Sequence, residues 1–423
     1  MSLKSPKNRQ IFNIFCLFCL CIFSINLSLS YHKYQIFMDK GEQELVATVI
    51  SSYEKLSSDG KKRQILRLKT DEFTFYTLGA KTDDFKSGDN IFLSVINLDV
   101  GFKDYISSAF YMPSFSREKL PRKTTPDINQ KLQSSIYNQH ENSKIAQLYS
   151  ALFLGTNIDG ELRDDVSNWG IAHLIAISGY HLGVISAVCF FVLKLILKPI
   201  YARYLPFRSY IFDISIAVFL VLCFYFYLIG FIPSFLRAFL MSVAGFYMIC
   251  KRIKILNFYT LFGVILFGIA MFPQLLFSVG FYFSCLGVFY IFVYLLYFAP
   301  KFGLLANSLL LNLYVFFAME VAVLYFFPLI SLLQLSVLAL NYLFGLFYPL
   351  SFVLHLFGYG GIFDEILSKM LAVRLSPSNL HISTFVFLLY NAATLLCIKF
   401  KASALLPPLF GVVAFLLYLL NFS

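Results

Sequence analysis

Long apolar runs constrain this chain more than any other feature of its sequence. Each is close to the length of about 20 residues that a helix needs to cross a bilayer. Hydrophobic residues make up 59% of the 423 positions and charged residues 13%, whereas soluble domains are about 45–50% apolar and about 25% charged. The sequence therefore predicts a polytopic α-helical membrane protein, and not a soluble enzyme.

The positions of basic residues test the order of the spans, because Lys and Arg collect in cytoplasmic loops. With the N-terminus inside, Lys194, Lys251 and Lys301 fall on the cytoplasmic side. Beyond 301 the alternation fails, and an additional half-span or re-entrant piece within 349–381 would restore it. After the N-terminal apolar stretch, the expected spans are 172–193, 209–229, 234–250, 256–272, 277–298, 303–327, 329–348, 382–398 and 404–421.

Residues 1–30 form the first expected element. Lys4, Lys7 and Arg9 precede an apolar run, which is the pattern of a signal anchor or of a signal peptide. Ser28 is small enough to permit cleavage nearby. We favour an uncleaved N-terminal membrane anchor, because the later spans give no reason to remove it.

Residues 31–115 differ in kind from the rest of the chain. Short runs alternate apolar and polar side chains, and turn signals at 58–60 and 87–90 separate them. Several short strands in so few residues predict a small extracytoplasmic β-barrel, an OB-like domain that follows the first transmembrane helix. Residues 116–145 are then expected to form a linker, and 146–423 the polytopic transmembrane domain.

The net charge of +11 invites a nucleic-acid interpretation. Cytoplasmic loops of a membrane protein explain most of it without one. Cys16, Cys19 and Cys21 mimic the spacing of metal ligands, but they lie in an apolar run with no histidine nearby. They are therefore expected to be buried cysteines, and the sequence predicts neither a metal nor another cofactor.

The most polar membrane segment is HLIAISGYHLG, residues 173–183. Such side chains are costly in a bilayer unless they line a polar path or pair with one another. Ser178 and His181 are three residues apart, so they can meet on one helix face. Gly179 and Gly183 have the spacing that allows close helix packing. A hydrogen-bonded helix junction explains this segment as well as a functional site does.

This segment resembles the HLLAISGLHVGL signature of the ComEC competence-protein family. Upstream, ALFLG at 151–155 and ELR at 161–163 resemble that family's ALLLG and ELR segments. Downstream, GFIPSFLRAFLM at 230–241 resembles its G-x-x-P-S-x-x-R-A-x-x-M run, and FSVGFYFS at 277–284, after Pro273, resembles its P…DxGFQLS run. The motifs follow in the order of the family, over about residues 145–350.

Three positions depart from the family pattern. Tyr180 replaces an aliphatic residue, Ser278 an acidic residue and Tyr282 a glutamine. The last two put a polar role at those positions in doubt.

The resemblance implies a multi-pass inner-membrane channel that carries single-stranded DNA into the cytoplasm during natural transformation. It also implies a DNA receptor outside the membrane, and it allows a homo-oligomer. Many members carry a C-terminal metallo-β-lactamase-like nuclease domain, whose H-x-H-x-D-H signature does not occur here, so no enzymatic activity is expected. Since the sequence also contains no G-x-x-x-x-G-K-[ST] run, a cytoplasmic motor or single-strand-binding proteins must drive transport.

A polyanion that crosses lipid needs a polar, partly cationic path. Arg237 follows Pro233 at an expected helix start, where the helix dipole favours phosphate. It could instead snorkel to the interface or pair with Glu320. We expect the path to be lined by His173, Ser178, His181, Arg237 and Glu320. Helix packing is expected at Gly179, Gly183 and Pro233.

The OB-like segment carries a basic cluster beside aromatic residues. OB-folds hold single strands by such charges together with stacking. The aromatics Phe73, Phe75 and Tyr76 could equally form the core, with the charges on a solvated hairpin. The candidate DNA contacts are Lys61, Lys62, Arg63, Arg67 and Lys69.

Two other functions remain open. Composition alone allows a small-solute transporter, which an inverted repeat with paired broken helices would favour. An intramembrane hydrolase could use Ser178 as nucleophile, with His181 or His173 as base. It would also need an orienting acid, and Glu320 is the deepest carboxylate in the sequence.

Overall fold

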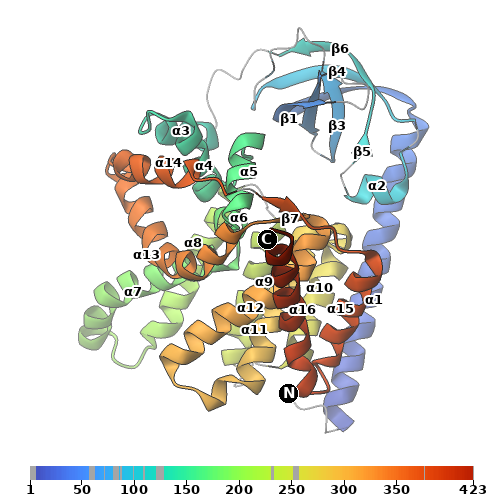
Figure 1. Cartoon of the computed structure of the whole chain (residues 1–423). Coiled ribbons are helices and arrows are strands. Elements are labelled where there is room, and N and C mark those ends of the chain that lie inside the picture. The colour runs from blue at the N-terminus through green and yellow to red at the C-terminus, as the bar shows by residue number, and fades with distance from the viewer. Residues whose placement is uncertain are drawn as a thin grey trace. The chain divides into compact units, whose positions relative to one another are not determined.

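The computed structural model describes residues 6–56, 62–70, 72–79, 85, 88–98, 100–107, 110–120, 128–229, 233–250, 257–375 and 377–422. The chain forms two compact units (Figure 1). The first comprises residues 2–126 with 265–279 and contains a β-sheet, and the second comprises residues 127–264 with 280–423 and is helical.

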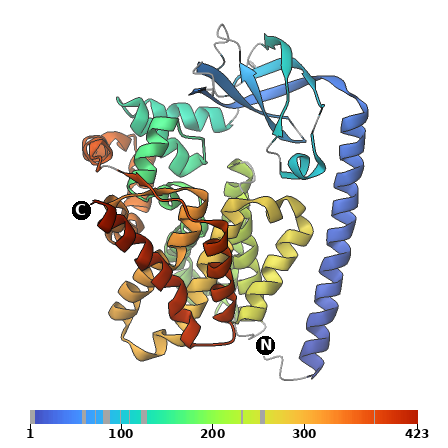
Figure 2. The same cartoon turned by 45° about the vertical axis from the view of Figure 1, so that its right-hand side comes forward.

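The first unit begins with one long helix, α1 (Pro6–Asp39), which Figure 2 shows without a break. The helix is longer than the anchor expected at 1–30, because no helix breaker occurs before Gly41, whose φ of 61° suits glycine. Asn26 satisfies its amide in the apolar segment by donating to the carbonyl of Ala270 at 2.8 Å.

A six-stranded sheet follows α1, in the order β5-β3-β2-β1-β4-β6. The long strand β1 pairs antiparallel with β4 over its first half and with β2 over its second half, and its register shifts at Val49–Ser51. The strands are β1 (Glu42–Leu56), β2 (Lys62–Lys69), β3 (Thr74–Gly79), β4 (Asn90–Ile96), β5 (Phe110–Tyr111) and β6 (Ser114–Lys119).

The strand expectation for 31–115 is confirmed, but the described strands do not pair into a closed barrel. β5 and β6 stand at opposite edges of the pairing order. The hydroxyls of Thr77 in β3 and Ser114 in β6 nevertheless lie 2.6 Å apart. Alternation buries one face, with Leu66 and Leu68 of β2 fully buried. The short helix α2 (Phe102–Ser107) also packs against α1, where Phe102 meets Tyr31 edge to face at 5.1 Å.

The described residues of the segment 116–145, which was expected to be a linker, include regular elements. It contains most of β6, which pairs with β4 as far as Lys119. It also contains α3 (Ile128–Tyr137) and the start of α4 (Ser143–Leu154). Most side chains of β6 are exposed, so the sequence of this strand shows little alternation of apolar and polar residues.

Helices dominate the second unit. α10 (Phe258–Met271) begins there and ends in the first unit, where η1 (Pro273–Phe277) follows it. The remaining elements are α5 (Gly160–Asn168), α6 (Ala172–Ile175), α7 (Gly179–Tyr204), α8 (Tyr210–Leu228), α9 (Pro233–Cys250), α11 (Val279–Tyr297), η2 (Ala299–Lys301), α12 (Leu304–Phe326), β7 (Leu329–Ile330), η3 (Leu332–Ser336), α13 (Val337–Leu356), η4 (Gly360–Phe363), α14 (Asp364–Ala372), β8 (Ser378–Asn379), α15 (Thr384–Leu396), η5 (Ala402–Leu405) and α16 (Leu406–Phe422).

Within the described residues, seven helical stretches are long and apolar enough to cross a membrane. The multi-pass membrane architecture is therefore confirmed. The expected spans at 234–250, 256–272 and 382–398 correspond to shorter apolar helices. The seven stretches are Arg9–Asp39, Gly179–Tyr204, Tyr210–Leu228, Val279–Lys301, Leu304–Phe326, Leu332–Leu356 and Ala402–Leu420.

Two expected spans have different bounds in the structure. The span expected at 172–193 is interrupted after α6, and α7 begins only at Gly179 and runs to Tyr204. The span expected at 329–348 corresponds to α13, which ends at Leu356, so the apolar residues after 349 continue this helix. α14 is nine residues long, too short to cross a bilayer.

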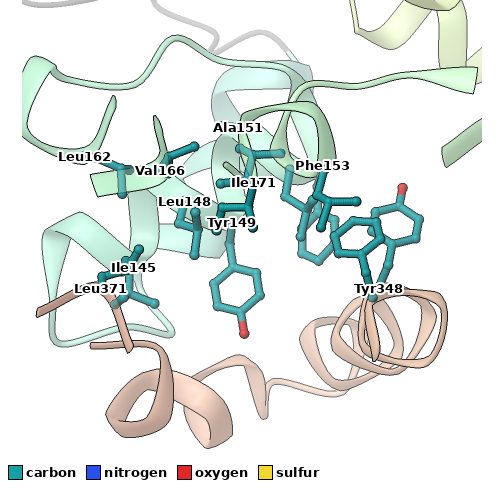
Figure 3. Packing of buried hydrophobic residues seen from close by; sticks show 14 of the residues in the cluster. Ile145, Leu148, Tyr149, Ala151, Phe153, Leu162, Val166, Ile171, Tyr348 and Leu371 are labelled. Atoms are coloured by element: carbon teal, nitrogen blue, oxygen red, sulfur yellow. The ribbon is translucent and has the colours of Figure 1, made fainter. Parts of the chain in front are cut away.

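One hydrophobic core of the second unit forms where α4 packs against α13 and α14. Figure 3 shows Phe153 of α4 beside Tyr348 of α13, and Ile145 of α4 beside Leu371 of α14. Asn142 caps the start of α4, and Gly155, at φ 67°, ends it. Each large side chain fully buried in this way contributes about 1.5–3 kcal/mol.

Candidate functional site

The helical structure is interrupted between α6 and α7, inside the polar segment 173–183. The hydroxyl of Ser178 accepts a hydrogen bond from the backbone N–H of Tyr180 at 3.3 Å. In return, Nδ1 of His181 accepts from the backbone N–H of Ser178 at 3.2 Å. This capping box satisfies N–H groups that a helix start leaves unpaired. The meeting of Ser178 and His181 predicted from their spacing therefore exists, and it forms a helix cap.

His181 is fully buried between aromatic rings of α13. The ring centroids of Phe344 and Tyr348 lie 5.4 and 4.7 Å from that of His181, both in edge-on geometry. Because Nδ1 accepts a hydrogen bond, the neutral ring carries its proton on Nε2, which has no partner among the described residues. Within the same part of the chain, the contacts of this ring include no carboxylate to orient it as a base.

His173 begins a chain of polar side chains that crosses three helices. Its Nε2 lies 3.1 Å from Oδ1 of Asn341 on α13. The amide of Asn341 donates to Oδ1 of Asn312 on α12 at 2.8 Å, and Asn312 donates to the carbonyl of Leu338 at 2.7 Å. Nδ1 of His173 faces the carbonyl of Gly170 at 3.1 Å. Both ring nitrogens face oxygen acceptors, so both bonds form together only when the ring is protonated.

Sequence reasoning missed Asn341 and Asn312. Their signal was available, because a lone asparagine within an apolar run is costly in a bilayer unless it finds a partner. The exposed Tyr180 extends the same group, since its hydroxyl donates to the carbonyl of Asn341 at 3.2 Å.

The two glycines of the polar segment differ in their surroundings. A Cβ added at Gly179 would lie 3.3 Å from that of Ala238 on α9, so close packing occurs there. A Cβ at Gly183 would meet no atom of the described residues within 4 Å, so the packing expectation at Gly183 stays a prediction. Pro233 begins α9, but its side chain lies outside the described residues.

Glu320 and Arg237 lie on different helices. Arg237 belongs to α9, and its side chain lies outside the described residues, so its pairing with Glu320 stays a prediction. Glu320 of α12 is only 6% exposed, and it makes no hydrogen bond or ion pair with the described residues. α16 packs closely on α12 at this residue, because a Cβ at Gly411 would overlap the carbonyl oxygen of Phe317 and lie 3.1 Å from the Cβ of Glu320.

Tyr282, which departs from the family pattern, keeps a polar contact. Its hydroxyl donates to Oδ1 of Asn391 on α15 at 2.8 Å. A tyrosine at this position therefore retains hydrogen-bonding capacity between α11 and α15.

A cleft of about 510 Å³ opens between α7, α8 and α9. Its walls are mostly apolar, and its polar lining residues are Ser186, Lys194, Ser215 and Ser242. Lys194, expected on the cytoplasmic side, therefore lies at a hollow rather than on a featureless helix face.

The basic cluster of the sheet is described in part. Arg63 and Lys69 are exposed on β2, and the guanidinium of Arg67 lies over the ring of Tyr76 at 5.6 Å. Phe73 and Phe75 are buried, so these two aromatics belong to the core and cannot stack with bases. Lys61 and the side chain of Lys62 lie outside the described residues.

The described residues contain no group of three or more His, Cys, Asp or Glu side chains arranged to hold a metal ion. A family model described as Competence protein matches residues 152–422. The match runs from the end of α4 to α16. It includes the capped start of α7, the hydrogen-bonded side chains of His173, Asn341 and Asn312, and Glu320. No curated protein and no solved structure matches the chain.

Proposed function

Because this chain belongs to the competence protein family, we propose that it forms an inner-membrane channel for single-stranded DNA during natural transformation. The family match over residues 152–422 carries this proposal. The seven membrane-compatible stretches of the described residues support it, because a polyanion crosses a bilayer only through a protein-lined path.

The His173 chain supports a path near the start of α7. His173 would offer ring hydrogen-bonding groups at an exposed position, and Asn341 and Asn312 would continue a line of hydrogen-bonding groups inside apolar helices. Arg237 would add a permanent charge on α9. Ser178 and His181 would act by holding the start of α7, because their polar groups form its cap.

Partners and energy belong to the same proposal. The DNA strand would be delivered by a receptor outside the membrane and pulled by a cytoplasmic motor or by single-strand-binding proteins. The sheet of the first unit would act as an OB-like contact for the strand, through Arg63, Arg67 and Lys69. A homo-oligomer is compatible with this scheme.

The test is the entry of labelled DNA into naturally transformable cells in which this chain replaces their own channel. We expect Arg237→Ala to leave DNA outside the inner membrane and to lower transformation at least tenfold, because phosphate loses its cation. Arg237→Lys, which keeps the charge, should retain most of the transport. His173→Ala should lower uptake by a smaller factor.

Two controls give the outcome its meaning. Ser215→Ala in the cleft removes a hydroxyl that bonds its own helix, so it should leave uptake unchanged. Membrane levels of every variant are compared by immunoblot. Normal transformation with Arg237→Ala and with a full deletion would reject the channel and leave a small-solute transporter as the leading function. Hydrolysis of lipid or peptide by wild type, lost in Ser178→Ala, would support the hydrolase instead.

A further inference from the structure

Two histidines and one aspartate outside the proposed path meet at the junction of four helices. His140 lies between α3 and α4, His355 in the last turn of α13, and Asp364 at the start of α14. Nε2 of His140 lies 3.0 Å from Nε2 of His355. On its other side, Nδ1 of His140 lies 2.9 and 3.0 Å from the two carboxylate oxygens of Asp364.

The hydrogen-bond partners of these three side chains determine how many protons they hold. Nδ1 of His355 faces the carbonyl of Ser351 at 2.7 Å, and a carbonyl only accepts, so Nδ1 must carry a proton. An ionised Asp364 also only accepts, so Nδ1 of His140 carries a proton as well. The two Nε2 atoms would then be bare lone pairs facing each other at 3.0 Å, which is unfavourable without a proton between them.

The number of protons held by the three side chains is the same if Asp364, rather than His140, carries one of them. If Asp364 is protonated instead, it donates to Nδ1 of His140, whose Nε2–H donates to Nε2 of His355. In both arrangements the three side chains hold one proton more than an ionised aspartate with two neutral histidines. The total charge is zero in both, so burial does not oppose the extra proton as it would an isolated cation.

The surroundings favour a positive charge on His140. Its side chain is wholly buried, and the ring of Tyr149 stacks on it nearly parallel, with centroids 4.8 Å apart. The negative face of an aromatic ring attracts such a cation. Burial, together with the nearby charge of Asp364, raises the pKa of Tyr149, so this hydroxyl stays neutral and supplies no competing charge.

The other charged side chains on and around α4 and α14 either form ion pairs of their own or are exposed. On α14, Glu365 pairs with Lys369 at 2.6 Å. On α4, Lys144 pairs with Glu161 and with the buried Asp165. Glu141, next to His140, is exposed. Among the described residues, Asp364 is therefore the charge that faces the histidine pair.

The backbone is fitted closely around the pair. The side chain of Gln139 accepts from the backbone N–H of Gly360 at 2.9 Å and donates to the carbonyl of His355 at 3.2 Å. A Cβ added at Gly360 would lie 2.7 Å from Nε2 of His355. The loop after α3, the end of α13 and the start of α14 are thus joined at one point.

A metal ion is the competing ligand for two converging nitrogens. Tetrahedral zinc with Zn–N bonds of about 2.0–2.1 Å holds two nitrogens about 3.3 Å apart. The observed 3.0 Å is a hydrogen-bond distance. Asp364 faces Nδ1 of His140 and not the two Nε2 atoms, and the described residues contain no group of three or more His, Cys, Asp or Glu side chains arranged to hold a metal ion. The geometry favours the proton.

We propose that His140, His355 and Asp364 form a binding site for one proton, which joins the α3–α4 loop to the end of α13. The pair shares the proton between its Nε2 atoms, and Asp364 balances the charge. Removing the proton leaves facing lone pairs and loosens the junction.

The direct test is ¹⁵N spectroscopy of the histidine rings in the full chain, reconstituted in lipid vesicles. The chain has six histidines, and single His→Gln variants assign their signals. We expect an imidazole–imidazolium pair at neutral pH that disappears in both His140→Gln and His355→Gln. Two neutral rings at pH 6 together with an ionised Asp364 carboxylate, read from its ¹³C shift, would overturn the proposal. Because this experiment uses wild-type protein, it does not depend on the folding of a variant.

The second test is the pH dependence of unfolding in detergent micelles. Unfolded histidines titrate near pH 6.5, so above this pH the folded chain holds one proton more than the unfolded chain. Stability must then fall as pH rises, and the unfolding constant should increase by up to about tenfold per pH unit until the folded site itself loses its proton. His355→Gln provides an amide donor to Nε2 of His140, so this dependence should flatten.

The matched control is His381→Gln, which changes an exposed histidine and should keep the wild-type dependence. Equal pH dependence in wild type and His355→Gln would contradict the proposal. So would one zinc ion per chain by elemental analysis with loss of the junction on chelation, because the nitrogens would then bind metal.

Discussion

Two histidine sites lie along α13, and they differ in how their ring nitrogens are satisfied. His181 packs against Phe344 and Tyr348, and its Nε2 faces no partner among the described residues. Two turns further along, His355 and His140 have partners at every nitrogen. The comparison teaches that burial alone does not decide the part a histidine plays. What differs is the group that faces Nε2. Without a partner there, His181 caps a helix, whereas the facing Nε2 atoms of His140 and His355 can bind a proton.

Asp364→Ala should have the largest effect, because it removes the charge that balances the shared proton. Breaking a buried ion pair typically costs about 3–5 kcal/mol. The carboxylate is 20% exposed, so we expect a loss of about 2–3 kcal/mol, measured by chemical unfolding in detergent micelles at pH 6.

Glu365→Ala is the matched control on the same helix. Its carboxylate is largely exposed and pairs with Lys369, and such pairs contribute less than about 0.5 kcal/mol. Equal losses from the two substitutions would mean that α14 responds to any change of charge, and the contrast between the two histidine sites would collapse.

Gly360→Ala should have an intermediate effect, because the new methyl group would overlap Nε2 of His355 and the side-chain oxygen of Gln139. Overpacking of this kind costs about 1–3 kcal/mol. Gly183→Ala is the counterpart near His181, where an added Cβ would meet no other side chain of the described residues within 4 Å. It should be neutral or slightly stabilising, because alanine favours a helix over glycine by about 1 kcal/mol. Unfolding of both variants under the same conditions measures this contrast, and a reversed order would show that the packing around the two sites is misassigned.

His181→Gln should have the smallest effect. Glutamine at the third position of a capping box can still accept from the backbone N–H of Ser178, and the substitution removes the unpartnered Nε2 group. We expect a change below about 1 kcal/mol and an unaltered pH dependence of unfolding. A large loss, or a flattened pH profile, would give His181 a titrating role and remove the distinction between the two sites.

Much of the candidate site could be predicted from local sequence. Ser178 and His181 are three residues apart, and a helix start brings such residues together without help from the rest of the fold. Asn341 and Asn312 were missed because they are distant from His173 in the chain. The spacing of Gly179 and Gly183 could not specify which helix passes nearby, and among the described residues α9 packs at Gly179.

The sequence by itself determined the membrane architecture, the strands between 42 and 96, and the family of the chain. Hydrophobic length, period-two alternation and ordered motifs are all local properties, so they can be read without the fold. Only the tertiary structure decided which polar groups meet. His140, His355 and Asp364 show no common pattern in the sequence. They form one site because the packing of α4 against α13 and α14 brings three distant segments within hydrogen-bonding distance.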